Sequence, residues 1–188
     1  MLFRSAADGE CSSWEDACDL LDALSGATSG DQIWVASGTY KPSGMGSDRY
    51  ATFQLLSGVA IYGGFPASGG DFLSRDPSTY ITTLSGDIDP MGNHINNSYH
   101  VVTGNGVDAT AVLDGFTISW GRGNSEILPY DRGAGIINYF GSPTLTNIIF
   151  YNNSASYGGG MYNHYGSPNL NNVTFYQNSA GTGGGIFN

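Results

Sequence analysis

Charged residues are absent from the last part of this sequence: between Gly133 and Asn188 there is no Asp, Glu, Lys or Arg. The whole chain of 188 residues has only 6 Lys and Arg against 16 Asp and Glu, which gives a formal net charge of −10. Phosphate backbones and anionic lipid headgroups repel such a chain, so its net charge argues strongly against nucleic acid or an anionic membrane as a partner. An acidic surface favours divalent cations instead.

Long apolar runs are missing as well. No stretch approaches the roughly 18 apolar residues that a transmembrane helix requires, so we expect no membrane insertion. Residues 1–4 are not followed by the apolar core of a secretion signal. We therefore expect a mature or truncated chain.

Cysteine is scarce, with only 2 residues, Cys11 and Cys18. The sequence contains no Cys/His cluster, no phosphate-binding loop and no nucleophile elbow, so it lacks the motifs of those enzyme classes. An even pair of cysteines in a chain rich in Gly and Asn favours the disulfide of a secreted protein, with a metal site as the alternative. We predict a Cys11–Cys18 disulfide and a secreted or cell-surface location.

What the sequence does contain is a repeat. The segment at residues 133–138 returns at 158–163 and again at 183–188, a shift of 25 residues each time. A fixed period of this size is typical of proteins built from stacked structural repeats. Equivalent asparagines would then form ladders, in which the side-chain amides hydrogen-bond along the column. These columns are Asn138/Asn163/Asn188, Asn147/Asn172 and Asn153/Asn178. The less favoured alternative is glycan attachment at residues 152–154 and 172–174.

The apolar pattern inside the repeat predicts strands. Leu145, Ile148 and Phe150 stay apolar in the next copy, whereas Ile149 is replaced by Thr174. The first three residues should therefore face a core and Ile149 should face solvent. A unit of this length holds three strands of about four residues with their turns, so it can form one coil of a parallel β-solenoid with neighbours about 4.8 Å apart. We expect one all-β domain over residues 1–188.

The chain divides into three parts. Residues 12–27 should form an amphipathic helix that begins with a capping box at Ser12 to Glu15 and covers the open first coil. Residues 30–132 should form irregular coils with long loops, which are the usual place for function on a rigid scaffold. Residues 133–188 should form the regular coils, cut off at the C-terminus. An uncovered last coil predicts end-to-end self-association there.

The sequence resembles the right-handed parallel β-helix proteins of bacterial surfaces. The resemblance covers nearly the whole chain and is carried by residues 13–24, 30–42, 58–65, 84–89 and 113–118. The repeats are also similar to those of polymorphic outer-membrane proteins, in the spacing of Phe150 with Asn153 and of Phe175 with Asn178. The resemblance implies a right-handed parallel β-helix at the cell surface, and it brings no catalytic residues with it.

An enzyme is the alternative, because parallel β-helices also include polysaccharide lyases and glycoside hydrolases. Such enzymes use a strong base beside an acid-bound calcium, or clustered carboxylates. The candidates are Asp87, Asp89, Arg122 and Arg132 in the loops. Asp87, Asp89 and Asn93 also offer hard oxygen ligands that suit calcium, although a solvated acidic loop is the simpler interpretation. No cofactor is required, and calcium is an optional one.

Aromatic residues are the more distinctive surface feature. If Phe150 and Phe175 point inward, the alternation of a strand sends Tyr151 and Tyr176 outward. A flat, uncharged face of Tyr, Asn and Ser can stack on sugar rings and hydrogen-bond their hydroxyls, while the alternative is that the rings only stabilise adjacent coils. The candidate ligand-binding residues are Tyr139, Tyr151, Tyr162, Tyr165 and Tyr176. We therefore predict a non-enzymatic module for adhesion or carbohydrate contact, with a glycan or cell-surface ligand as its partner.

Overall fold

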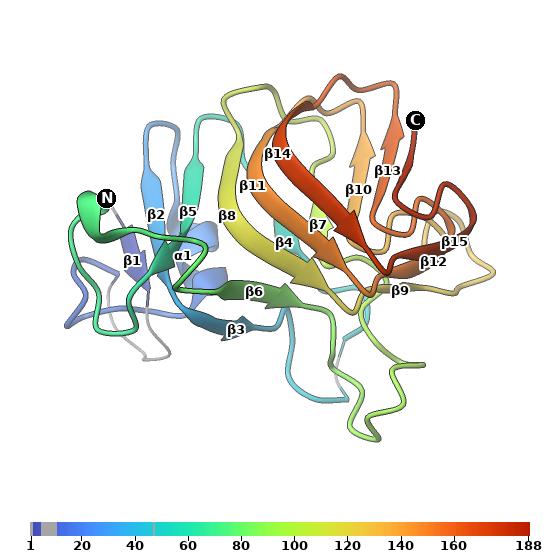
Figure 1. The fold of residues 1–188 in the computed structure, drawn as a ribbon, viewed down its shortest axis with the longest axis horizontal. Coiled ribbons are helices and arrows are strands. Elements are labelled where there is room, and N and C mark those ends of the chain that lie inside the picture. The colour runs from blue at the N-terminus through green and yellow to red at the C-terminus, as the bar shows by residue number, and fades with distance from the viewer. Residues whose placement is uncertain (1, 5–10, 47) are drawn as a thin grey trace.

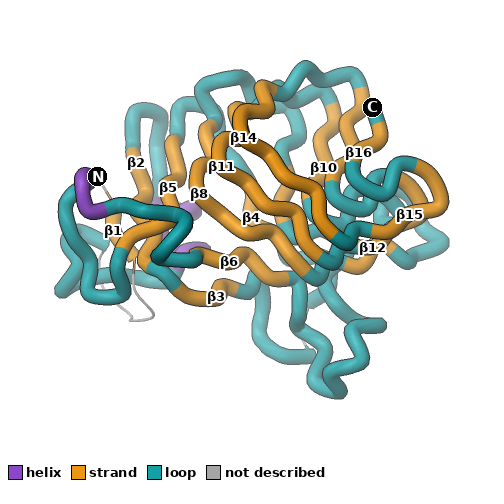
Figure 2. Tube along the Cα trace, viewed as in Figure 1, coloured by secondary structure: helices purple, strands orange, loops and turns teal. Residues whose placement is uncertain are grey.

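The computed structural model describes residues 2–4, 11–46 and 48–188, and it is an all-β protein built from three parallel sheets. Figures 1 and 2 show the strands stacked side by side along the long axis of the molecule. Sheet A contains β1 (Leu2–Arg4), β2 (Gln32–Ala36), β5 (Ala60–Phe65), β8 (Val112–Ser119), β11 (Thr144–Tyr151) and β14 (Asn169–Tyr176), with β3 (Gly38–Tyr40) and β6 (Thr82–Ser85) at its side. Sheet B contains β4 (Phe53–Gln54), β7 (Val102–Thr103), β10 (Ile136–Tyr139), β13 (Met161–His164) and β16 (Ile186–Phe187). Sheet C contains β9 (Arg122–Gly123), β12 (Ser154–Tyr157) and β15 (Ser179–Thr182).

The repeat of the sequence is the repeat of the structure. From β8 onward the chain contributes one strand to sheet A, one to sheet C and one to sheet B in turn. Each new strand pairs in parallel with the preceding strand of the same sheet. Leu145 pairs with Leu170, Ala155 with Ala180 and Asn138 with Asn163, so residues 25 positions apart lie at the same level of adjacent strands. Before residue 133 the number of residues between paired positions varies, because long loops of different length separate the strands. Ile33 pairs with Ile61, and Ile61 pairs with Leu113.

The predicted inward and outward positions of the repeat are confirmed. Leu145, Ile148 and Phe150 have no exposed surface, whereas Ile149 is 43% exposed. The inward residues join one continuous apolar core that also includes Ile118 of the preceding layer. Alternation along β11 therefore separates a buried face from a free one.

Left-handed residues turn the chain at the same place in the layers of β8, β11 and β14. Trp120, Asn152 and Gln177 follow the ends of β8, β11 and β14 with φ values of 64°, 53° and 54°. Their position is fixed by register, since the preceding residues Ser119, Tyr151 and Tyr176 pair with one another. This column of left-handed residues makes the corner between sheets A and C.

The predicted asparagine ladders are also present. Asn138 Nδ2 donates to Asn163 Oδ1, and Asn163 Nδ2 donates to Asn188 Oδ1, both at 2.5 Å. The two other columns are linked in the same way, with Asn172 Nδ2 2.7 Å from Asn147 Oδ1 and Asn153 Nδ2 3.0 Å from Asn178 Oδ1. These hydrogen bonds link adjacent layers, which gives Asn147 and Asn172 a structural role.

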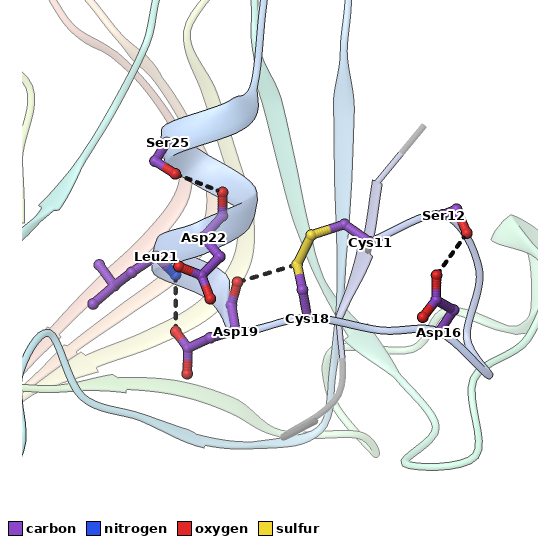
Figure 3. The surroundings of a disulfide bond; sticks show 8 residues. All are labelled: Cys11, Ser12, Asp16, Cys18, Asp19, Leu21, Asp22 and Ser25. Carbon is purple, nitrogen blue, oxygen red and sulfur yellow. Dashed lines mark hydrogen bonds between the residues drawn. A yellow bond between two sulfur atoms is a disulfide. The ribbon is translucent and has the colours of Figure 1, made fainter. Parts of the chain in front are cut away.

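The N-terminal helix is shorter than the sequence predicts, and its predicted start at Ser12 is wrong. Helix α1 spans Leu20–Gly26, and its N-cap is Asp19, whose carboxylate accepts a hydrogen bond from the backbone N–H of Leu21. A turn ahead of the helix is closed instead by Ser13, whose hydroxyl accepts from the backbone N–H of Asp16, one position later than the predicted pair of Ser12 and Glu15. Figure 3 shows that turn beside the disulfide between Cys11 and Cys18.

Strand β1, which the sequence analysis did not predict, covers the edge of β2. Its residues pair in parallel with β2, with Leu2 opposite Ile33. Helix α1 has a different place: its buried residues Leu20, Ala23 and Leu24 pack into the apolar core. The first layer is therefore closed at its edge by a strand, and the helix fills the core beside it. In the described part of the chain, no helix has the length and apolar character needed to cross a membrane.

The last layer is more open than the layers before it. Strands β14, β15 and β16 each have one strand neighbour within the described chain. Leu170 is 40% exposed and Ile186 is 38% exposed, although their partners Leu145 and Met161 are fully buried. An apolar surface is thus available at this end of the stack.

Candidate functional site

An aromatic column runs along the corner between sheets A and C. Tyr151 in β11 stacks on Tyr176 in β14, with ring centroids 5.6 Å apart and planes 9° apart. Trp120 lies on the other side of Tyr151 at 6.2 Å, nearly perpendicular to it at 78°. Trp120 in turn stacks on His94 at 4.2 Å. We call these four residues the corner column.

The register and the corner explain why these rings lie together. Phe150 is fully buried, so the next residue, Tyr151, points away from the core, and the same holds one layer on for Phe175 and Tyr176. Trp120 comes one residue after the partner of Tyr151, where the left-handed turn begins. Tyr176 is 55% exposed. The hydroxyls of Tyr151 and Tyr176 make no hydrogen bond with the part of the chain that the structure describes.

A cavity of about 130 Å³ lies next to the corner column. Trp120 and His94 form part of its wall. Its polar lining comes from Asn93, Asn97, Arg122, Asn152 and Ser154. Arg122 and Ser154 face the same way because they pair directly in sheet C. The cavity therefore combines amide, hydroxyl and guanidinium groups with one aromatic wall.

Arg49 holds the loops that form this cavity. Its Nε donates to the backbone carbonyl of Asn97 at 2.8 Å, and its Nη2 donates to the carbonyl of Arg122 at 3.4 Å and to Asn124 Oδ1 at 2.5 Å. The guanidinium also lies 4.0 Å from the ring centroid of Tyr99. In Figure 1 the loops before β4 and after β6 project on the same side of the molecule. This role is not predictable from the sequence, because Arg49 and its partners share no motif or fixed spacing.

The five predicted ligand-binding tyrosines do not form one face. Tyr151 and Tyr176 belong to the corner column, whereas Tyr139 and Tyr162 lie in β10 and β13 of sheet B. Tyr162 is only 4% exposed, so its predicted contact with a ligand is wrong.

Arg132 explains the burial of Tyr162. Its Nη1 donates to the hydroxyl of Tyr162 at 3.1 Å and to that of Tyr139 at 3.4 Å. The guanidinium also packs over Tyr157 and Tyr162. Burial raises the pKa of Tyr139, and the hydrogen bond from Arg132 opposes that rise. Arg132 is therefore a packing residue of sheet B, outside the cavity that Arg122 lines.

Tyr165 occupies a third position. It follows β13 and stacks on Phe140, which follows β10, with centroids 5.4 Å apart and planes 17° apart. Both residues have left-handed backbones, with φ values of 55°. Phe140 is 67% exposed and Tyr165 is 78% exposed. This pair is an open aromatic surface, and the ring of His164 packs against Tyr165 with centroids 4.2 Å apart. The buried Nδ1 of His164 has no hydrogen-bond partner in the described part of the chain.

The two candidate catalytic carboxylates serve different purposes. Asp87 lies 2.9 Å from His94 Nδ1 and 3.7 Å from Lys41 Nζ. Asp89 is 1% exposed and accepts hydrogen bonds from the backbone N–H groups of Asn96 and Met91, each at 2.9 Å. These bonds, that from Asn96 foremost, hold the pKa of Asp89 below its usual value. Asp89 thus stabilises its loop, and Asp87 anchors the histidine of the corner column.

The third predicted calcium ligand, Asn93, is also hydrogen-bonded within its own loop. Asn93 Oδ1 accepts a hydrogen bond from the backbone N–H of Ile95. Outside residues 1, 5–10 and 47, the chain has no cluster of three or more His, Cys, Asp or Glu residues with the geometry of a metal site. Calcium binding by Asp87, Asp89 and Asn93 stays a prediction.

His100 lies in the interior below the loops. It is 6% exposed, its Nδ1 lies 3.2 Å from the carbonyl oxygen of Gly133, and its ring stacks on Tyr130 at 5.6 Å. Burial lowers the pKa of His100 to about 4, so the imidazole is neutral at pH 7. This histidine supports the fold and does not reach the cavity lining.

A second groove, of about 330 Å³, lies between the loop at Asp76 to Ser78 and the outer side of β11 and β14. Its wall includes Ile149 and Thr174. The carboxylate of Asp76 already accepts hydrogen bonds from Ser78 and Thr79, which lower its pKa. The groove has no aromatic wall, so the corner column and its cavity are the better candidate for a ligand.

Comparison with known proteins found no matching family model, no matching curated protein and no matching solved structure.

Proposed function

We propose that this chain is a right-handed parallel β-helix module of a secreted or cell-surface bacterial protein, and that it binds carbohydrate through the corner column. The order of the sheets and the register of 25 residues support the β-helix. The disulfide between Cys11 and Cys18 supports an oxidising location, where such bonds persist. Adhesion to a glycan on another surface would be the biological result.

The observation that carries the binding proposal is the exposed stack of Tyr151 and Tyr176 beside Trp120. Tyrosine combines an apolar ring with a hydroxyl, which suits sugars because they have apolar faces and a rim of hydroxyls. Asn152 and Ser154 next to the stack add hydrogen-bonding groups. The rings are held by register and by the corner, so binding requires little ordering of side chains.

The alternative is a polysaccharide lyase or glycoside hydrolase that uses the loops between residues 87 and 132. A hydrolase requires a pair of carboxylates that flank the scissile bond. Asp89 is buried under two backbone amides and Asp87 is engaged by His94 and Lys41, which favours binding over catalysis. An assay for new reducing ends and unsaturated products on every bound glycan separates the two functions.

A glycan array followed by calorimetry on the hits tests the proposal. Tyr176→Ala should weaken binding about tenfold or more, because truncating a central aromatic contact typically costs about 2 kcal/mol. Tyr165→Ala is the matched control, since Tyr165 is also exposed and stacked but lies at a different corner. Equal losses in the two variants, or no loss in Tyr176→Ala, would contradict binding at the corner column.

A further inference from the structure

Arg122 is the one basic residue with a described side chain that has no partner for its charge in the described structure. Lys41, Arg75 and Arg132 each lie within 4 Å of an aspartate, at 3.7, 2.7 and 3.2 Å. Arg49 is held by carbonyl and amide oxygens and by the ring of Tyr99. In a chain with a net charge of −10, an arginine without an aspartate beside it is unexpected.

The backbone of Arg122 is fixed in the cavity wall. Its N–H donates to the carbonyl of Ser98 at 2.7 Å, and its carbonyl accepts from Arg49 Nη2. On the other side it pairs with Ser154 of β12. The residue thus has a defined place, while its guanidinium makes no hydrogen bond or ion pair with any described residue.

The cavity that Arg122 lines contains no carboxylate. Its polar groups are the amides of Asn93, Asn97 and Asn152, the hydroxyl of Ser154 and the imidazole of His94. Asp87 contacts that imidazole through Nδ1. Positive charge in this cavity is therefore not neutralised from within, and a guanidinium matches a planar carboxylate with two parallel hydrogen bonds.

From these contacts we infer that the ligand of the corner site is an acidic oligosaccharide, with one sugar carboxylate bound to Arg122 and a neighbouring ring against the corner column. The inference rests on the proposed carbohydrate binding and adds the chemical class of the ligand. Trp120 and Tyr151 supply contact with the ring, which neutral and acidic sugars share. Arg122 supplies the discrimination between them.

Matched pairs of oligosaccharides test this inference by isothermal titration calorimetry on the whole chain. Cellotetraose and tetraglucuronate with the same β-1,4 linkages differ only in the oxidation state of C6, as do mannotetraose and tetramannuronate. The acidic member of a pair should bind about tenfold tighter or more at low salt, because hydrogen bonds to charged groups are worth about 1.5–3 kcal/mol. The difference should shrink as salt rises, since the ion pair is partly open to solvent.

Variants of Arg122 assign the preference to this residue. Arg122→Gln should abolish the preference, so that the acidic and the neutral member of each pair bind with affinities within about twofold of each other. Arg122→Lys should retain part of the preference, because it keeps the charge but loses the bidentate geometry. The melting temperature of both variants should match that of the original chain, since the side chain has no described partner to lose.

Four results would overturn the inference. Equal affinity within each pair overturns the inference and leaves the carbohydrate proposal standing. A preference for the acidic member that survives in Arg122→Gln has the same two consequences. Absence of binding to all four oligosaccharides, with hits from neutral glycans on the array, also overturns it. Absence of any glycan binding overturns the inference together with the proposed function.

Discussion

Truncation of Phe150 and Phe175 to alanine tests how the layers of this protein are held together. The two rings stack with centroids 4.8 Å apart and planes 5° apart, and they occupy the same position of successive repeats. The sequence treats them as equivalent. The structure does not, because Phe150 is fully buried between two layers, whereas Phe175 lies in the open last layer and is only partly buried.

The expected losses of stability follow from that difference in burial. Phe150→Ala should destabilise the fold by about 3–5 kcal/mol, because it removes a fully buried ring and leaves a cavity with walls on both sides. Phe175→Ala should cost roughly half as much, since part of the ring surface is already in contact with water. The double variant should lose less than the sum, because the rings are each other's neighbours.

Urea unfolding followed by circular dichroism measures these free energies, with the slope m checked for a change in mechanism. Ile149→Ala is the control on the same strand: Ile149 is 43% exposed and should cost about 1 kcal/mol or less. A loss below about 1 kcal/mol for Phe150→Ala would refute the inward assignment. Equal losses for Phe150 and Phe175 would refute the openness of the last layer.

Three further predictions concern pH, the disulfide and the open end. His100 has a folded-state pKa of about 4, below its unfolded value of about 6.5, so the unfolded chain takes up the proton first as pH falls. The free energy of unfolding should therefore fall by about 3 kcal/mol between pH 6.5 and pH 4. Urea unfolding across this range should show the loss, and His100→Gln should lack it. Reduction of the bond between Cys11 and Cys18 should cost about 2 kcal/mol through the freed loop, and a variant with serine at both positions should not respond to reductant. The open last layer should self-associate in a concentration-dependent manner, with Ile186→Lys reducing the association in light scattering; a monomer at every concentration would count against it.

The regular half of the fold could be predicted because the period fixes the register. Once residues 25 apart lie at one level, the buried position of Phe150, the exposed position of Ile149 and the asparagine ladders follow from alternation alone. The outward positions of Tyr151 and Tyr176 follow by the same reasoning. These features depend on local pattern and on identical neighbours, both of which the sequence contains.

The remaining features depend on contacts between segments far apart in the chain. Arg49 reaches Asn97 and Arg122, which lie 48 and 73 positions away, and no motif marks these partners. Tyr162, a candidate ligand-binding residue in the sequence, is buried because Arg132 from a long loop covers it. The prediction of the helix start was wrong because Ser13 closes a turn with Asp16, and Asp19 caps the helix instead.

Fluorine NMR of the chain labelled with 5-fluorotryptophan tests the central claim, that carbohydrate binds at the corner column. The chain has 3 tryptophans, and only Trp120 lies in the column. Trp14 and Trp34 pack on Phe65 in the N-terminal layers, with centroids 5.4 and 5.0 Å away, and serve as internal controls. Titration with tetraglucuronate and with cellotetraose should shift the Trp120 resonance, assigned by Trp120→Phe, and leave the other two in place. A titration in which Trp120 does not move while Trp14 or Trp34 does, or in which all three stay fixed, would contradict the account.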